Sequence, residues 1–193
     1  MNTVDGIDGI KQCTVDFNKS REVTNTIRRS ILEYVSTYAI HKVDIHTNTS
    51  TVFDCQLIQS LQMVPVICGD DTECQLLSAS LTVCNTLPTG QFLEVTTDDF
   101  KINKDLFKFP FCMPLLLLNP GEEISLTITL ARGNGLQHAK FSPVSTCYLT
   151  NEGLLTFETV GTMQPRTILE ASIKALITKL RQTRQELEEE EKL

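Results

Sequence analysis

The sequence predicts a protein of mixed helices and strands, and two patterns support this prediction. Apolar residues recur every three or four positions from Val23 to Val35, as they do on one face of an amphipathic helix. Apolar and polar residues then alternate from Lys42 to His46, and over a longer stretch from Ile124 to Leu130. Because each period is typical of one kind of element, helices and half-buried strands should occur in the same chain.

Charge and composition indicate a globular protein that does not hold nucleic acid on its own surface. The chain has 193 residues, 41% hydrophobic and 21% charged, which suffices for one large domain or two small ones. Its formal charge is −7 and its pI is near 5.0, whereas binding to a nucleic-acid backbone needs clustered Lys and Arg. Much of the acid lies in one run, Glu186 and 188–191.

The cysteines and the hydropathy predict a soluble intracellular protein, in the nucleus or the cytoplasm. Seven cysteines are an odd number, and no basic lead followed by an apolar segment is seen at the amino terminus. Reduced thiols are therefore expected. The longest apolar run, Met113–Leu118, is far too short to cross a bilayer, so no membrane association is predicted.

The amino-terminal third is predicted to form a strand, a helix and a second strand. Alternation over residues 13–17 favours a strand, and Asn18 or Ser20 can cap the helix that follows. After the helix the chain should turn at Ser36-Thr37 and continue as a strand that ends near Ile45, before the polar loop 47–51.

The middle of the chain is predicted to contain a short helix and several strands. Apolar spacing indicates a helix over 53–63 that Pro65 ends. A turn is expected at 67–74 and irregular chain at 100–112, and Asn151-Glu152-Gly153 should join a hairpin. The predicted strands are 76–84, 92–95, 124–130, 147–150 and 154–160, and the apolar run 115–118 leads into a turn at 119–121.

The last predicted element is a long helix from about Pro165 to Glu190, with proline in its first turn. Its apolar residues alternate at steps of four and three and so form a heptad seam with one polar break, at Thr183. The seam consists of Leu169, Ile173, Leu176, Leu180, Thr183 and Leu187. Such a seam suits a helix that packs lengthwise on another helix, either within its own chain or in a partner. The reach of the seam to Leu187, beyond what a small sheet can cover, favours a partner.

Two patches of the sequence together resemble one protein family. The first comprises Asn25–Arg29, Tyr38–Ile40, Asn48–Ser50 and Leu61–Pro65. The second is Gly133-Asn134-Gly135 followed by His138–Pro143, which is similar to a G-x-G…HAKWxP segment. In this order the patches resemble the alpha-like assembly subunits of multisubunit RNA polymerases. That family includes the bacterial alpha amino-terminal domain, the third-largest eukaryotic subunit and its archaeal counterpart.

The resemblance implies an α+β fold in two parts. Residues 1–48 and 146–193 would form a discontinuous dimerisation domain, an antiparallel sheet with two helices packed on one face, and residues 49–145 a mostly β insertion domain. It also implies a noncatalytic scaffold subunit of DNA-dependent RNA polymerase. The expected partners are a smaller alpha-like subunit, the second-largest and largest subunits, and small assembly subunits. The compact insertion domain also fits a divergent source, such as a large DNA virus that carries its polymerase in the virion.

The resemblance places the interface on the first and last helices. In the family the first helix meets the partner alpha-like subunit and its arginines face a large catalytic subunit, a task that suits the guanidinium fork. The alternative for Arg28 and Arg29 is a pair of solvated ion pairs worth under ~1 kcal/mol each. The expected interface residues are Asn25, Ile27, Arg28, Arg29 and Ile31, with Leu169, Ile173, Leu176, Leu180 and Leu187 from the last helix.

No catalytic, cofactor-binding or metal site is predicted. Some family members carry a zinc or iron–sulfur loop, but Cys68, Cys74 and Cys84 are spaced C-x5-C-x9-C, with no C-x2-C pair and no nearby histidine. An enzyme that uses Cys147 or His138 is one alternative, although no nucleophile and base can be paired by spacing. A homodimeric coiled-coil adaptor unrelated to transcription is the other.

Overall fold

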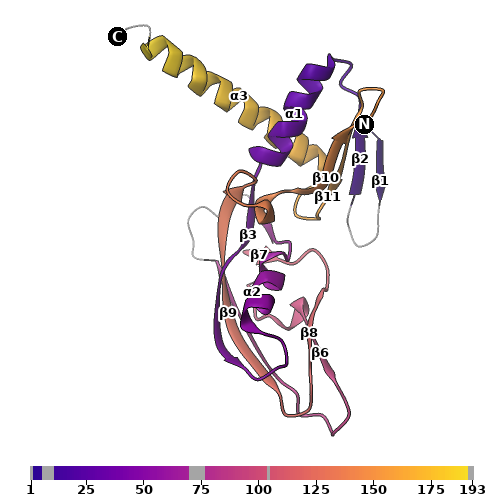
Figure 1. Ribbon diagram of the computed structural model, residues 1–193, viewed down its shortest axis with the longest axis vertical. Helices are drawn as coiled ribbons and strands as arrows, with labels where there is room; N and C mark the ends of the chain where they lie inside the picture. The colour runs from indigo at the N-terminus through magenta and orange to yellow at the C-terminus, as the bar shows by residue number, and fades with distance from the viewer. Residues whose placement is uncertain (1, 6–10, 70–76, 104, 191–193) are drawn as a thin grey trace. The chain divides into compact units, whose positions relative to one another are not determined.

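The computed structural model describes residues 2–5, 11–69, 77–103 and 105–190, and these form two compact units (Figure 1). The first unit comprises Met1–Thr37 with Gly133–Leu193, and the second comprises Tyr38–Arg132. The helices are α1 (Arg21–Glu33), α2 (Asp54–Gln62) and α3 (Pro165–Glu190). The strands are β1 (Asn2–Asp5), β2 (Lys11–Val15), β3 (Ser36–Asn48), β4 (Ile67–Cys68), β5 (Ser78–Cys84), β6 (Leu93–Thr96), β7 (Phe107–Lys108), β8 (Pro114–Leu118), β9 (Glu123–Asn134), β10 (Val144–Leu149) and β11 (Leu155–Thr159).

The first unit is an antiparallel sheet with strand order β1-β2-β11-β10, and α1 packs on β10, β11 and α3. The register places Phe157 of β11 between Cys13 of β2 and Cys147 of β10. Phe157, Ile31 of α1 and Ile168 of α3 are fully buried together, so sheet and helices share one core. The hairpin between β10 and β11 turns at Gly153, whose φ of +83° favours glycine.

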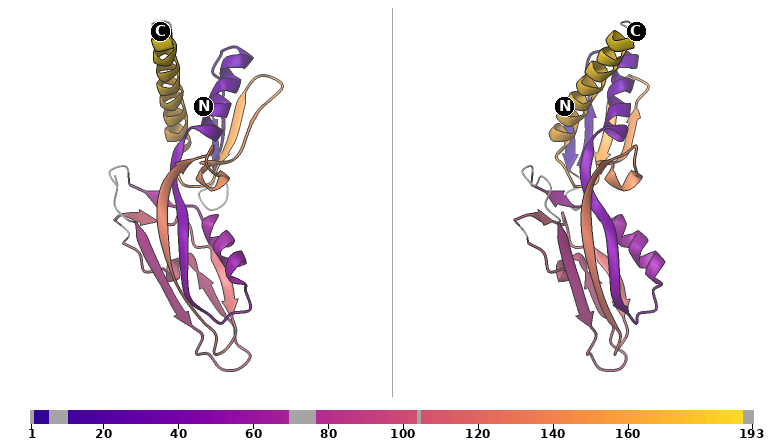
Figure 2. Two further views of the ribbon diagram at one scale, coloured as in Figure 1. Left: turned by 60° about the vertical axis from the view of Figure 1, so that its left-hand side comes forward. Right: turned by 90° about the vertical axis from the view of Figure 1, so that its left-hand side faces the viewer.

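The second unit is built mainly of strands. Its largest sheet has the order β3-β9-β5, and Figure 2 shows β3 and β9 running side by side over most of their length. The two-stranded sheets β4-β7 and β6-β8 complete it, and α2 packs beside β8. Its core consists of apolar side chains from the helix and the sheets, including Leu61 of α2, Leu118 of β8 and Leu126 of β9.

The α+β class is confirmed, and the predicted helices lie close to their observed bounds. Several local predictions were wrong. Strand β3 begins at Ser36, where a turn was expected, and continues to Asn48, because pairing with β9 requires backbone groups and not apolar side chains. Strand β9 likewise extends to Asn134.

Four short strands, β1, β4, β7 and β8, were not predicted at all; β8 is a run of apolar residues that shows no period of two. Strand β1 has the largely polar sequence NTVD, and its backbone pairs with β2. Strands β4 and β7 lie where a turn and irregular chain were expected, with Ile67 opposite Lys108. Two residues are too few for a period of two to be recognised. The remainder of that expected turn, residues 70–74, lies outside the described residues.

Candidate interaction surface

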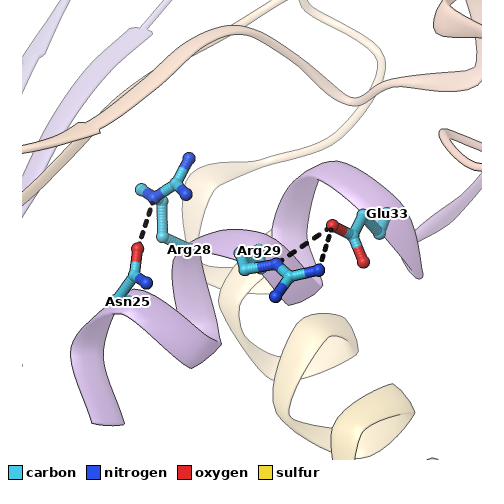
Figure 3. Close-up of polar contacts among 4 residues, drawn as sticks. All are labelled: Asn25, Arg28, Arg29 and Glu33. Carbon is cyan, nitrogen blue, oxygen red and sulfur yellow. Dashed lines mark hydrogen bonds and ion pairs between the residues drawn. The ribbon is translucent and has the colours of Figure 1, made fainter. Parts of the chain in front are cut away.

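The two adjacent arginines of α1 make separate polar contacts on their own helix (Figure 3). Arg28 donates its Nε–H to Oδ1 of Asn25 at 2.9 Å. Arg29 forms an ion pair with Glu33 one turn later, at 3.2 Å. Because consecutive helical residues are about 100° apart, the two guanidinium groups leave α1 in different directions. The surface pair of Arg29 contributes little stability.

Arg28 lies at a shallow hollow between the first turns of α1 and strand β10. The hollow is lined from α1 by Arg21, Glu22, Asn25 and Arg28, and from β10 by Cys147, Tyr148 and Leu149. The hollow carries both charge signs, from Arg21 and Arg28 and from Glu22, whose carboxyl pKa is lowered further by a hydrogen bond with Ser20. Tyr148 is an exposed aromatic side chain here, and sequence reasoning missed it because β10 was considered only as a strand.

The heptad seam of α3 is divided between a buried and an exposed part. Ile168 and Leu169, near the start of the helix, are buried against the sheet and α1. Farther along, Leu180 is 61% exposed and Leu187 is 56% exposed. Figures 1 and 2 show this end of α3 extending away from the sheet of its own unit. The described part of the chain therefore leaves apolar side chains of α3 in solvent.

The predicted interface residues fall into two groups. Ile27, Ile31 and Leu169 are buried in the core of their own unit, and Leu176 is partly buried. Arg28 is also partly buried, and the residues with exposed side chains are Asn25, Arg29, Ile173, Leu180 and Leu187. Contact of any of them with another chain remains a prediction. The buried group holds α1 and α3 in position beneath the exposed group.

A pair of serines, absent from the predicted set, joins the two helices. The Ser30 hydroxyl of α1 donates to the backbone carbonyl of Ser172 in α3 at 2.7 Å, and both residues are buried. The Ser172 hydroxyl donates in turn to the carbonyl of Leu169 at 2.8 Å. The available signal was a small polar residue on the apolar face of each helix, which permits close approach and a satisfied hydrogen bond.

The Gly133-x-Gly135 segment supports the carboxyl end of α1. A Cβ added at Gly135 would overlap the carbonyl oxygen of Leu32, and the next residue, Leu136, donates its backbone N–H to the carbonyl of Glu33 at 3.3 Å. A Cβ at Gly133 would lie 2.7 Å from the Phe141 ring. Glycine is therefore required at both positions by close contact with neighbouring groups.

His138 and Cys147 are both accounted for structurally. Nδ1 of His138 accepts the backbone N–H of Lys140 at 3.1 Å and so caps the 3₁₀ turn Ala139–Phe141. Burial raises the pKa of the Cys147 thiol to about 11, against a smaller opposing effect of Arg28. A thiol that stays protonated at neutral pH is a poor nucleophile.

The cysteines tested for metal binding do not form a site among the residues described. Cys68 is half-buried with a pKa raised by burial to about 11, and Cys84 is exposed. Cys74 lies outside the described residues. In the described ranges no group of three His, Cys, Asp or Glu side chains could hold a metal ion. Nor is any helix of those ranges long and apolar enough to cross a membrane.

Two helices on one face of an antiparallel sheet, the longer one with its apolar seam half uncovered, define a protein-association module. Comparison with known families agrees with this class. The family described as the RNA polymerase Rpb3/Rpb11 dimerisation domain matches residues 19–180. The chain belongs to this family, and the resemblance to alpha-like RNA polymerase subunits is confirmed.

Individual relatives are subunits of DNA-directed RNA polymerases. The chain is 29% identical to subunit Rpo3 of Methanocaldococcus jannaschii over 86% of its own length and 84% of the relative. It is 28% identical to Rpo3 of Methanosphaera stadtmanae, over 64% of the chain and 50% of the relative. It is 30% identical to human RPAC1, a subunit of RNA polymerases I and III, over 64% of the chain and 46% of the relative. The chain thus spans about half the length of several relatives it matches.

Proposed function

We propose that this chain is a noncatalytic assembly subunit of an intracellular DNA-dependent RNA polymerase. In this proposal it forms a heterodimer with a smaller alpha-like subunit, and the dimer then docks the second-largest and largest subunits and small assembly subunits. Membership of a family named for dimerisation supports the first step. The observation that carries it is the uncovered seam of α3, because exposed leucines in a row require a cover.

The proposal assigns different tasks to the two parts of the chain. Residues 1–48 and 146–193 would serve as the dimerisation domain, since they contain α1 and α3, and residues 49–145 as an insertion domain. Ile173, Leu180 and Leu187 would pack on the partner. Arg28 and Arg29 would bind carboxylate or carbonyl groups of a large subunit, since a guanidinium fork holds such groups in two places.

Dimerisation is tested by substituting an exposed seam residue. Leu180→Asp should abolish recovery of the smaller alpha-like subunit when the tagged chain is purified from its native source, because a carboxylate would be buried beneath a helix. Phe53→Asp is the matched control, since Phe53 is 77% exposed but lies in the second unit. Equal recovery with both variants contradicts the proposal. A monodisperse homodimer of the chain alone would favour the coiled-coil adaptor instead.

Docking of the large subunits is tested at the arginines. The double variant Arg28→Ala/Arg29→Ala should keep the heterodimer but lose the two large subunits in the same purification. Arg166→Ala is the control, because the Arg166 side chain is 85% exposed and pairs with Glu170 on its own helix. Retention of the large subunits by the double variant would remove the arginines from the proposed contact.

A further inference from the structure

The exposed half of α3, from Ile173 to Leu187, carries a cluster of positive charge that is unusual in this acidic chain. Between Glu170 and Glu186 the helix contains Lys174, Lys179, Arg181 and Arg184 and no acidic residue. The chain as a whole has a formal charge of −7. Positive charge therefore lies beside the apolar seam over the same turns that the rest of the unit leaves exposed.

Only two of these four basic residues border the seam. With about 100° per residue, Lys179 and Arg184 lie roughly 70° to either side of the line through Leu180 and Thr183. Lys174 and Arg181 lie about 130° or more from that line, on the far side of the helix. In paired helices, residues at the two flanking positions contact the partner and determine which partner is accepted.

The polar break in the seam does not interrupt it. The Thr183 hydroxyl donates to the backbone carbonyl of Lys179 at 3.1 Å, within its own helix. Its donor is therefore satisfied before any partner arrives, and covering Thr183 does not leave a buried hydroxyl unbonded. The seam can continue from Ile173 through Leu180 to Leu187 beneath a single helix.

The flanking charges are not neutralised strongly on α3 itself. No acidic residue lies three or four positions from Lys179 in either direction. Arg184 forms an ion pair with Glu188 at 2.7 Å, but both side chains are at least half exposed, so this pair contributes little. Both cations can therefore pair with carboxylates of another chain.

We propose that the helix covering this half of α3 belongs to the smaller alpha-like subunit and presents acidic side chains to Lys179 and Arg184. This rests on the proposed function, since it assumes that the seam is the dimer interface. The same charges disfavour a parallel pair of two copies of this chain, because Lys179 of one copy would face Arg184 of the other. Charge thus selects a heterologous acidic partner over that homodimer.

The test compares two double charge reversals with the same change in net charge. Lys179→Glu/Arg184→Glu reverses the flanking residues, and Lys174→Glu/Arg181→Glu reverses those on the far side. The probe is the smaller alpha-like chain that co-purifies from the native source, and its Kd is measured at low and high salt. We expect at least about tenfold weaker binding for the flanking variant and less than about threefold for the control. The difference should shrink at about 0.5 M salt.

Two further measurements keep the outcomes distinct. Circular dichroism should show the same helix content and thermal midpoint for both variants, because all four positions are exposed and Glu is as good a helix former as Lys. Equal Kd values for the two variants, or tighter binding by the flanking variant, overturn the charge proposal. If Leu180→Asp abolishes binding at the same time, the proposed dimerisation stands. If Leu180→Asp binds the smaller subunit normally, the seam is not the dimer interface, and the proposed function is contradicted together with the charge proposal that rests on it.

Discussion

The two halves of α3 have the same apolar spacing but different surroundings. From Pro165 to Ser172 the helix is packed on α1 and the sheet, with Ile168 fully buried and Ser172 bonded to Ser30. From Ile173 to Leu187 the same seam is largely exposed in the described part of the chain: Leu176 is partly buried, and Leu180 and Leu187 are more than half exposed. The same apolar spacing thus serves the fold of the chain in the first part of the helix and stays exposed in the second part, where we propose that a partner binds.

The largest expected effect follows from removing a side chain in the buried half. Ile168→Ala should lower the free energy of unfolding by about 2–4 kcal/mol, because it leaves a cavity among Ile31, Phe157 and their neighbours. Ile177→Ala, in the exposed half, should cost less than about 1 kcal/mol. Chemical denaturation of the two purified variants measures both values. Similar losses would mean that the two halves are not distinct in the way described.

A second prediction concerns the Gly133-x-Gly135 segment, which supports the carboxyl end of α1. The buried half of α3 packs on α1. Gly135→Ala should destabilise the chain by about 2–3 kcal/mol, because the new Cβ overlaps the Leu32 carbonyl oxygen and the backbone must move. Gly69→Ala is the control, because among the described residues no atom would lie within 4 Å of the new Cβ, whereas Gly90→Ala is unsuitable because its φ is +93°. A loss for Gly135→Ala no larger than for Gly69→Ala contradicts the close contact. Thermal unfolding of the three proteins is the measurement.

Most of the fold was predictable, and the gaps have physical causes. The bounds of α3 could be predicted because a helical period repeated over many turns is a strong signal. The point along α3 at which its own unit stops covering the helix could not be predicted, because the spacing of Leu169 and Leu187 is the same whichever chain buries them. Strands β4 and β7 are too short to show a period, and their pairing is a long-range contact.

The candidate surface shows the same limit. Arg28 and Arg29 were identifiable from their motif, but which neighbour each would contact depended on rotamers and on Asn25 and Glu33. The need for glycine at Gly135 depends on the passage of α1 against it, which no local pattern encodes. Residues that fit a motif could thus be found in advance, whereas those defined by contact between distant segments could not.

A third, smaller effect is expected at the hydrogen bond that joins α1 to the buried half of α3. Ser30→Ala removes the donor to the Ser172 carbonyl and should cost about 1 kcal/mol. Thr26→Ala is the matched control, since its hydroxyl donates to the Glu22 carbonyl on an exposed part of the same helix. Urea denaturation should separate the two variants. A neutral Ser30→Ala would show that packing alone holds the helices together.

The smallest expected effect tests the exposed half directly. Leu187→Ala should change the free energy of unfolding of the purified chain by less than about 0.5 kcal/mol, because Leu187 is 56% exposed and alanine is the better helix former. In the heterodimer the same substitution should weaken association several-fold, because the side chain is then covered. The two measurements, denaturation of the chain alone and Kd for the smaller alpha-like subunit, must diverge if the seam serves association. A loss of chain stability matching the loss of affinity would place Leu187 in the fold and not in the interface.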